Sequence, residues 1–79
     1  MSITSDQIRA AKAMLRWSGE ELSLRSGVSL STVRRVESAN GVPEVQSIRT
    51  VLAIKKALEE AGVEFIGTPE DGPGVRLRG

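Results

Sequence analysis

The chain has 79 residues, a formal net charge of +1, and neither cysteine nor histidine. A chain of this length forms one small domain, which buries too little surface for an elaborate active site. Without Cys or His it lacks a disulfide framework, a thiolate metal site and the commonest acid/base group, so we expect no enzyme, no metal ion and no cofactor.

The first helix is marked by capping residues near the N-terminus. Thr4 and Gln7 have the spacing of a capping box, with Ile3 and Ile8 placed as a hydrophobic staple around it. This pattern predicts a helix that begins at Ser5.

Two further helix starts follow at short spacing. Ser18 and Glu21 form a second capping box, which predicts a helix over residues 19–26. Gly27 offers the left-handed residue that closes a helix, and Ser29 is a third N-cap two residues later. The sequence therefore predicts two short helices joined by a tight turn.

The helix over residues 29–38 has one apolar side and one polar side. At a hundred degrees per residue, Val33 and Val36 share one side. The opposite side carries Ser31, Arg34, Arg35 and Ser38. This spacing is typical of a helix-turn-helix, whose second helix can lie in the DNA major groove, although a generic pair of surface helices would look the same.

The segment from Trp17 to Gly41 resembles the XRE (Cro/cI-like) family of bacterial and phage transcriptional regulators. The residues in register with that family are Leu22, Gly27, Val28, Ser29, Val33, Val36 and Glu37. The resemblance covers roughly residues 7–61. It implies a mainly α, compact four- or five-helix bundle of the lambda-repressor-like type, which binds operator DNA as a homodimer.

The resemblance also implies which residues contact DNA. Base edges would be reached by Leu30, Ser31 and Arg35, whereas Thr32 and Arg34 would lie near phosphates, Ser38 would follow on the same side, and Ser18 and Gly19 would approach the backbone. Three positions depart from the family pattern. Gly19 replaces a Gln that usually touches a phosphate, Leu30 replaces a frequent Arg or Gln, and Leu24 replaces a polar residue.

The two unusual leucines leave alternatives open. Leu30 could read a thymine methyl group by apolar contact. Leu24 and Leu30 could instead form a patch that binds a protein partner, although scattered surface leucines are also normal.

Charge is distributed unevenly along the chain. The segment from Arg9 to Arg35 has six basic and two acidic residues, a net charge of +4. The segment from Val36 to Asp71 has three basic and seven acidic residues, a net charge of −4. A basic half that faces a polyanion would show this asymmetry. Ordinary solvated helix faces would show it too.

A long amphipathic helix is predicted after the helix-turn-helix. Val51, Ile54 and Leu58 follow a helical step, which predicts a helix over residues 47–61 that ends before Gly62. Residues 44–46 could be its first turn or a separate short helix, because glycine and proline precede them.

Two β-prone runs close the chain. Residues 63–67 and 74–78 flank the turn-rich segment 68–73, which predicts a hairpin loop. The hairpin could fold on its own helices, or the strands of two subunits could join in one sheet, which we favour because the core is small. We therefore predict a DNA-binding domain over residues 1–62 and a dimerisation element over residues 63–79. Arg76 and Arg78 could contact phosphates, or they could blunt a strand edge.

Taken together, these features predict a sequence-specific DNA-binding transcriptional regulator. It would act as a repressor that binds a pseudo-palindromic operator as a homodimer through the helix over residues 29–38. The alternative is a protein-interaction module on the same fold, such as an antitoxin-like or antiactivator subunit. We expect a cytoplasmic protein with double-stranded DNA as its partner and no membrane association, because the longest apolar run is four residues, Val51–Ile54.

Overall fold

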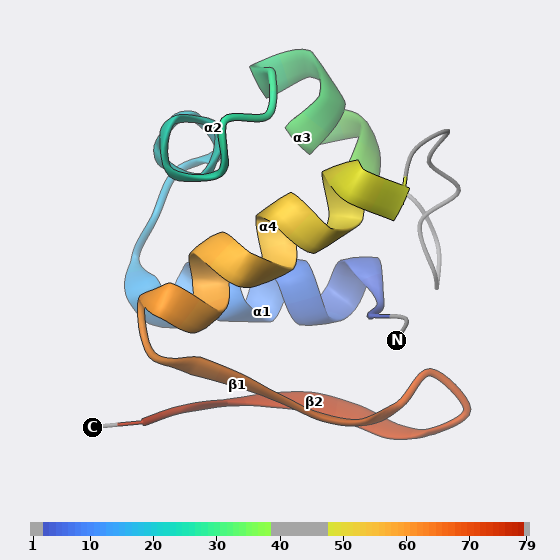
Figure 1. Cartoon of the computed structure of the whole chain (residues 1–79). Helices are drawn as coiled ribbons and strands as arrows, with labels where there is room; N and C mark the ends of the chain where they lie inside the picture. The colour runs from blue at the N-terminus through green and yellow to red at the C-terminus, as the bar shows by residue number, and fades with distance from the viewer. Residues whose placement is uncertain (1–2, 39–47, 79) are drawn as a thin grey trace.

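The computed structural model describes residues 3–38 and 48–78 of a mainly helical protein (Figure 1). Its elements are helices α1 (Ser5–Leu15), α2 (Gly19–Ser26), α3 (Leu30–Ser38) and α4 (Ile48–Glu60), then strands β1 (Val63–Thr68) and β2 (Asp71–Leu77). Helices α1 and α4 form a middle layer between the α2–α3 pair and the hairpin (Figure 1). Helix α3 and the hairpin therefore lie at opposite ends of the molecule. Among the described helices, none has the length and hydropathy that crossing a bilayer requires.

The first two helices begin where their caps predicted. The Thr4 hydroxyl accepts from the Gln7 amide at 3.0 Å, and the Gln7 side-chain oxygen accepts from the Thr4 amide at 2.8 Å, so the first capping box is complete. The Ser18 hydroxyl accepts from the Glu21 amide at 3.0 Å. The prediction of a complete second capping box is wrong, because the Glu21 carboxylate accepts from Arg25 Nε at 2.6 Å rather than from the Ser18 amide.

Helix α3 also begins at its predicted cap. The Ser29 hydroxyl accepts from the Thr32 amide at 3.3 Å. Gly27 closes α2 with a φ of 75°, in the left-handed region where a glycine has no steric penalty. The turn between α2 and α3 is therefore as tight as the spacing predicted.

Helix α4 ends one residue before the predicted limit, at Glu60, and Gly62 follows with a φ of 105°. The predicted start at Ser47 and the alternatives for residues 44–46 lie outside the described residues.

A single apolar core joins the helices to the hairpin. Its buried members are Ile3, Ile8, Ala11, Leu22, Val33, Val36, Ile54, Ala57, Leu58 and Val63. Trp17 packs against this core, and the Arg25 guanidinium lies 5.0 Å from the centre of its ring. Both residues of the predicted apolar side of α3 are thus buried.

The hairpin has a shorter turn than the sequence predicted. The strands continue to Thr68 and from Asp71, so the prediction of a six-residue turn over residues 68–73 is wrong. Gly67 explains the difference, because it has a φ of 74° at an irregularity in the strand register. A Cβ built at Gly67 would lie 2.3 Å from the carbonyl oxygen of Gly72, so only glycine allows the strands to approach this closely.

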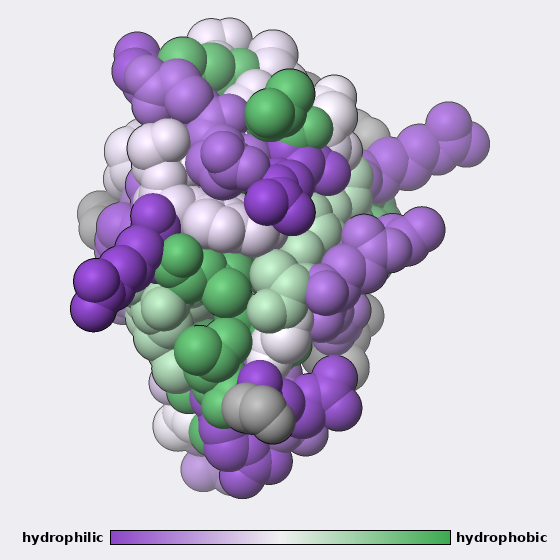
Figure 2. All heavy atoms as spheres, turned by 90° about the vertical axis from the view of Figure 1, so that its left-hand side faces the viewer, coloured by the Kyte–Doolittle hydropathy of each residue, from purple (hydrophilic) through white to green (hydrophobic). Residues whose placement is uncertain are grey.

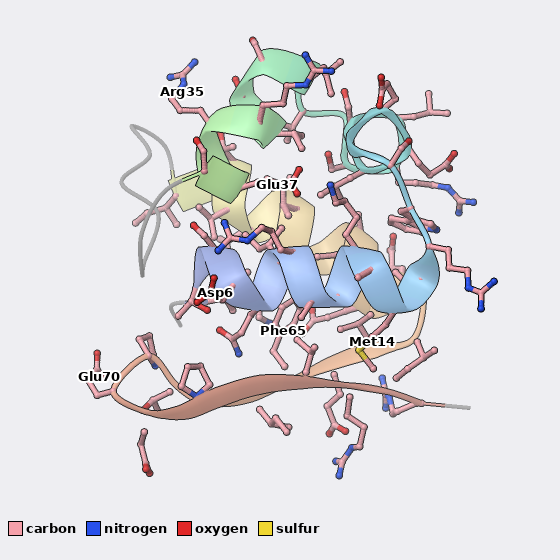
Figure 3. All side chains as sticks on the ribbon, turned by 180° about the vertical axis from the view of Figure 1, so that it is seen from behind. Asp6, Met14, Arg35, Glu37, Phe65 and Glu70 are labelled. Atoms are coloured by element: carbon pink, nitrogen blue, oxygen red, sulfur yellow. The ribbon has the colours of Figure 1, made fainter. Side chains whose placement is uncertain are left out.

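The hairpin packs against helices of its own chain. Strand β2 lies on α1 and β1 lies on α4, and Phe65 points toward α1 (Figure 3). The Gln7 side-chain amide donates to the carbonyl oxygens of Ile66 at 3.2 Å and Gly74 at 2.9 Å. Of the two alternatives for the hairpin, folding on its own helices is therefore observed, while a role in dimerisation stays a prediction.

The outer face of the hairpin carries an ion pair. Arg76 donates to the Glu64 carboxylate from Nε at 2.9 Å and from Nη2 at 2.5 Å. This hydrogen bonding, and then the charge of Arg76, lower the pKa of Glu64. The pair therefore stabilises the hairpin above the ordinary pKa of a glutamate, and its contribution is lost as the pH falls through the lowered value.

Candidate nucleic-acid interface

Helix α3 presents a charged side to solvent. Figure 3 shows Arg35 directed away from the body of the protein, whereas Glu37 points inward toward α1. Val33 and Val36 are buried beneath the helix. The division of α3 into a polar and an apolar side is therefore confirmed.

The predicted site residues differ in exposure. Ser18, Ser31, Arg34, Arg35 and Ser38 are exposed, whereas Gly19, Leu30 and Thr32 are half-buried. Four of the exposed residues are on α3, and Ser18 caps α2. The structure thus gathers most of the predicted site on α3, and Gly19 and Leu30 occupy the junction between α3 and the start of α2.

Hydroxyl groups cluster at the start of α3. The Ser29 hydroxyl donates to the Thr32 hydroxyl oxygen at 2.8 Å and lies 3.4 Å from that of Ser31. Because Thr32 accepts this bond, its own hydrogen remains available to an outside acceptor. At the other end of α3, the Ser38 hydroxyl donates to the carbonyl oxygen of Arg35 at 3.1 Å.

The two arginines of α3 have different surroundings. Arg34 Nη2 lies 3.8 Å from Glu20 Oε2, and both side chains are 68% exposed. A pair this long and this exposed contributes little to stability. Within residues 3–38 and 48–78, no carboxylate lies within ion-pair distance of Arg35. Arg35 is therefore the more available of the two guanidinium groups.

The surplus of +4 over residues 9–35 already counts Glu20 and Glu21, and folding adds two carboxylates from outside this segment. Of the six basic side chains between residues 9 and 35, four pair with carboxylates. The pairs are Arg9–Asp6, Lys12–Glu37, Arg25–Glu21 and Arg34–Glu20. Most of these cations are therefore paired within the described structure, which leaves Arg16 and Arg35 without a carboxylate partner among the described residues.

Side chains of α1 hold the C-terminal end of α3. The Ser5 hydroxyl donates to the Val36 carbonyl oxygen at 2.6 Å, and Arg9 donates to the carbonyl oxygen of Glu37. Lys12 Nζ lies 2.6 Å from Glu37 Oε1, and both side chains are mostly buried. The last carbonyl groups of a helix have no partner within it, so Ser5 and Arg9 satisfy two of them, and the Lys12–Glu37 ion pair adds a further contact that fixes the position of α3.

Sequence reasoning missed this bracing role of Ser5, Arg9 and Lys12. Their partners lie far along the chain, so no local spacing marks them. The only available signal was the acidic Glu37 at the end of an otherwise basic helix.

Leu30 packs against the start of α2. A Cβ built at Gly19 would lie 3.4 Å from Leu30 Cδ1 and 3.8 Å from Glu37 Oε2. Leu30 thus lies within van der Waals distance of the position that a Cβ at residue 19 would take. Of the two unusual leucines, Leu30 is half-buried, whereas Leu24 is 77% exposed.

Comparison of the chain with known protein families and with curated proteins found no match. The functional interpretation therefore depends on the chemistry of α3 and its surroundings. Guanidinium and hydroxyl groups on one exposed helix side can donate hydrogen bonds to phosphate oxygens and to the acceptor edge of guanine.

Proposed function

We propose that the protein is a sequence-specific DNA-binding transcriptional regulator that acts as a repressor. In this proposal α2 and α3 form a helix-turn-helix of the lambda-repressor-like type, and α3 enters the major groove. The observation that supports it is the exposed side of α3, where Arg35 stands free of described carboxylates while the helix is braced from behind by α1. Repression requires no chemistry, only occupancy of a promoter.

Each exposed group has a role suited to its surroundings. Arg35 is placed to read a base, because a guanidinium without a competing carboxylate can bond both acceptors of guanine. Arg34 can exchange its long contact with Glu20 for a phosphate. Ser31, Thr32 and Ser18 supply hydroxyl donors near the sugar-phosphate backbone, whereas Gly19 faces Leu30 within the protein.

Specificity requires a second copy of the helix. One recognition helix contacts only a few base pairs, and two-fold symmetric regulators place two such helices about 34 Å apart. We therefore propose a homodimer on a pseudo-palindromic operator, acting in the cytoplasm without a cofactor.

The decisive experiment is selection of bound sequences from random duplexes with the purified protein. We expect two related half-sites whose centres are about one helical turn apart. Competition with unrelated duplexes at physiological salt then measures specificity. Recovery of no preferred sequence would contradict the proposal.

A second candidate function is a protein-interaction module, which the exposed Leu24 favours. On this reading α2 and α3 bind another protein rather than DNA. It would be supported if the protein showed no preferred duplex and Leu24→Ala abolished binding to a defined protein partner.

Leu30→Ala should weaken binding to all duplexes similarly and leave base preference unchanged. Leu30 is half-buried against Gly19, so its truncation loosens the junction between α2 and α3 rather than removing a base contact. Leu30→Met, which keeps most of the volume, is the matched control and should retain affinity. Repeating the selection with each variant measures the effect, and loss of preference at a single thymine would show that Leu30 reads a base.

A further inference from the structure

The C-terminal ends of α1, α4 and β2 meet at one side of the molecule (Figure 1). We call this side the end face and define it by Met14, Leu15, Glu60, Leu77 and Arg78. Met14 and Leu77 are each 41% exposed, and Leu15 is half-buried. Figure 2 views the molecule from this side and shows a band of apolar atoms with charged side chains projecting around it.

The end face is held together by contacts between its elements. The Arg78 amide donates to the Gly62 carbonyl oxygen at 2.8 Å, which ties the end of β2 to the turn after α4. A Cβ built at Gly62 would lie 3.7 Å from Leu77 Cδ1, so Leu77 covers that turn. Met14 extends from α1 toward the same end of the hairpin (Figure 3). The apolar band is therefore part of the ordered body of the protein.

We propose that the end face binds a second copy of this chain. An exposed apolar band on so small a domain indicates an interaction surface, and two-fold pairing would bury the band against itself. Charged residues on the same side of the molecule also favour a second copy of the chain as the partner. Arg16, Arg78 and Glu60 are all exposed, and within the described ranges none is within ion-pair distance of an opposite charge. A two-fold axis through the band can bring arginines of one copy to Glu60 of the partner subunit.

The position of α3 supports the same surface. Helix α3 and the hairpin lie at opposite ends, and the end face runs along the side between them (Figure 1). A two-fold axis along this side leaves α3 uncovered in both copies and turned to the same side of the dimer. This argument rests on the proposed function, because only binding to one duplex requires the two helices to face the same way.

Other dimers through the hairpin fit less well. Pairing through its outer face would bury the Glu64–Arg76 ion pair and point the two α3 helices in opposite directions. Joining the β2 edges of two copies would set the two β2 strands about 4.8 Å apart. Because α1 lies over β2, the two α1 helices would then lie closer than the roughly 8 to 10 Å that packed helices need. The C-terminal extension thus contributes Leu77 to a packed interface rather than a strand to a shared sheet.

The test is sedimentation of the full chain over a range of concentrations. The wild type should dimerise, and Leu77→Lys should raise the dimer dissociation constant by about tenfold or more, because it places a charge within an apolar contact. Ile66→Lys is the matched control. Ile66 is 40% exposed on the opposite face of the same hairpin, so this variant should dimerise like the wild type.

Two further variants keep the test independent of a folding defect. Met14→Lys reaches the same surface from α1 and should weaken the dimer, and Glu60→Arg should weaken it through charge alone. A wild type that stays monomeric, or a Leu77→Lys protein as dimeric as Ile66→Lys, would overturn the inference. DNA binding is measured separately, so a dimer that obeys these predictions but selects no duplex would refute the proposed function and leave the interface standing.

Discussion

Replacing Arg35 by alanine should lower affinity for the selected operator by about 1 to 3 kcal/mol and relax the preference at one base position. The side chain points away from the protein, and it contacts no carboxylate among the described residues. Its removal should therefore leave the fold intact and affect only what α3 contacts. Titration of labelled operator and of single-base variants measures both effects.

Arg34→Ala is the matched control, because Arg34 is the neighbouring guanidinium on the same helix. Its contact with Glu20 suits it to a phosphate rather than a base. We expect weaker binding to every sequence, with unchanged base preference. The slope of the logarithm of affinity against the logarithm of salt concentration should become shallower by about one. If both variants kept full operator affinity, α3 would not be the DNA-reading helix.

Local capping signals predicted the helix starts to the residue. Each N-cap acts on an amide three residues ahead, so its whole interaction lies within a short stretch of sequence. The same locality limits such predictions. The return half of the second box was wrong because Arg25, one turn further on, competes for the Glu21 carboxylate.

Features that depend on distant contacts could not be predicted from spacing. Lys12 was counted in the basic segment and Glu37 in the acidic one, but the packing of α1 on α3 places the two side by side. The contact of Leu30 with Gly19 could not be predicted either, because a glycine in another helix carries no pattern of its own. Spacing therefore predicted which side of α3 is exposed, but not the residues that hold the helix in place.

The hairpin shows a third limit. Turn-forming residues predicted a long loop over residues 68–73, yet both strands extend into this segment, to Thr68 and from Asp71. Gly67, just before the predicted loop, allows an irregularity in the register and a close approach of the two strands. Glycine permits either outcome, and packing of the hairpin on α1 and α4 decides between them.

Leu22→Ala should lower the free energy of unfolding by about 2 to 5 kcal/mol, the largest effect we expect of any single substitution here. Leu22 is fully buried in α2, where it joins the helices to the common core. A domain of this size has about 5 to 10 kcal/mol of stability, so the variant should be only marginally folded. Its midpoint of thermal unfolding should fall by about 10 °C or more.

Leu24→Ala is the control for this substitution, because it removes the same atoms from the same helix two residues away. Leu24 is 77% exposed, so its truncation should change the free energy of unfolding by no more than about 0.5 kcal/mol. Urea unfolding of both variants, followed by circular dichroism, gives the comparison. Equal losses would show that Leu24 is covered in solution, which would place a second copy of the chain on the outer side of α2. A large loss for Leu22 alone supports the orientation of α2 on which the proposed α3 interface depends.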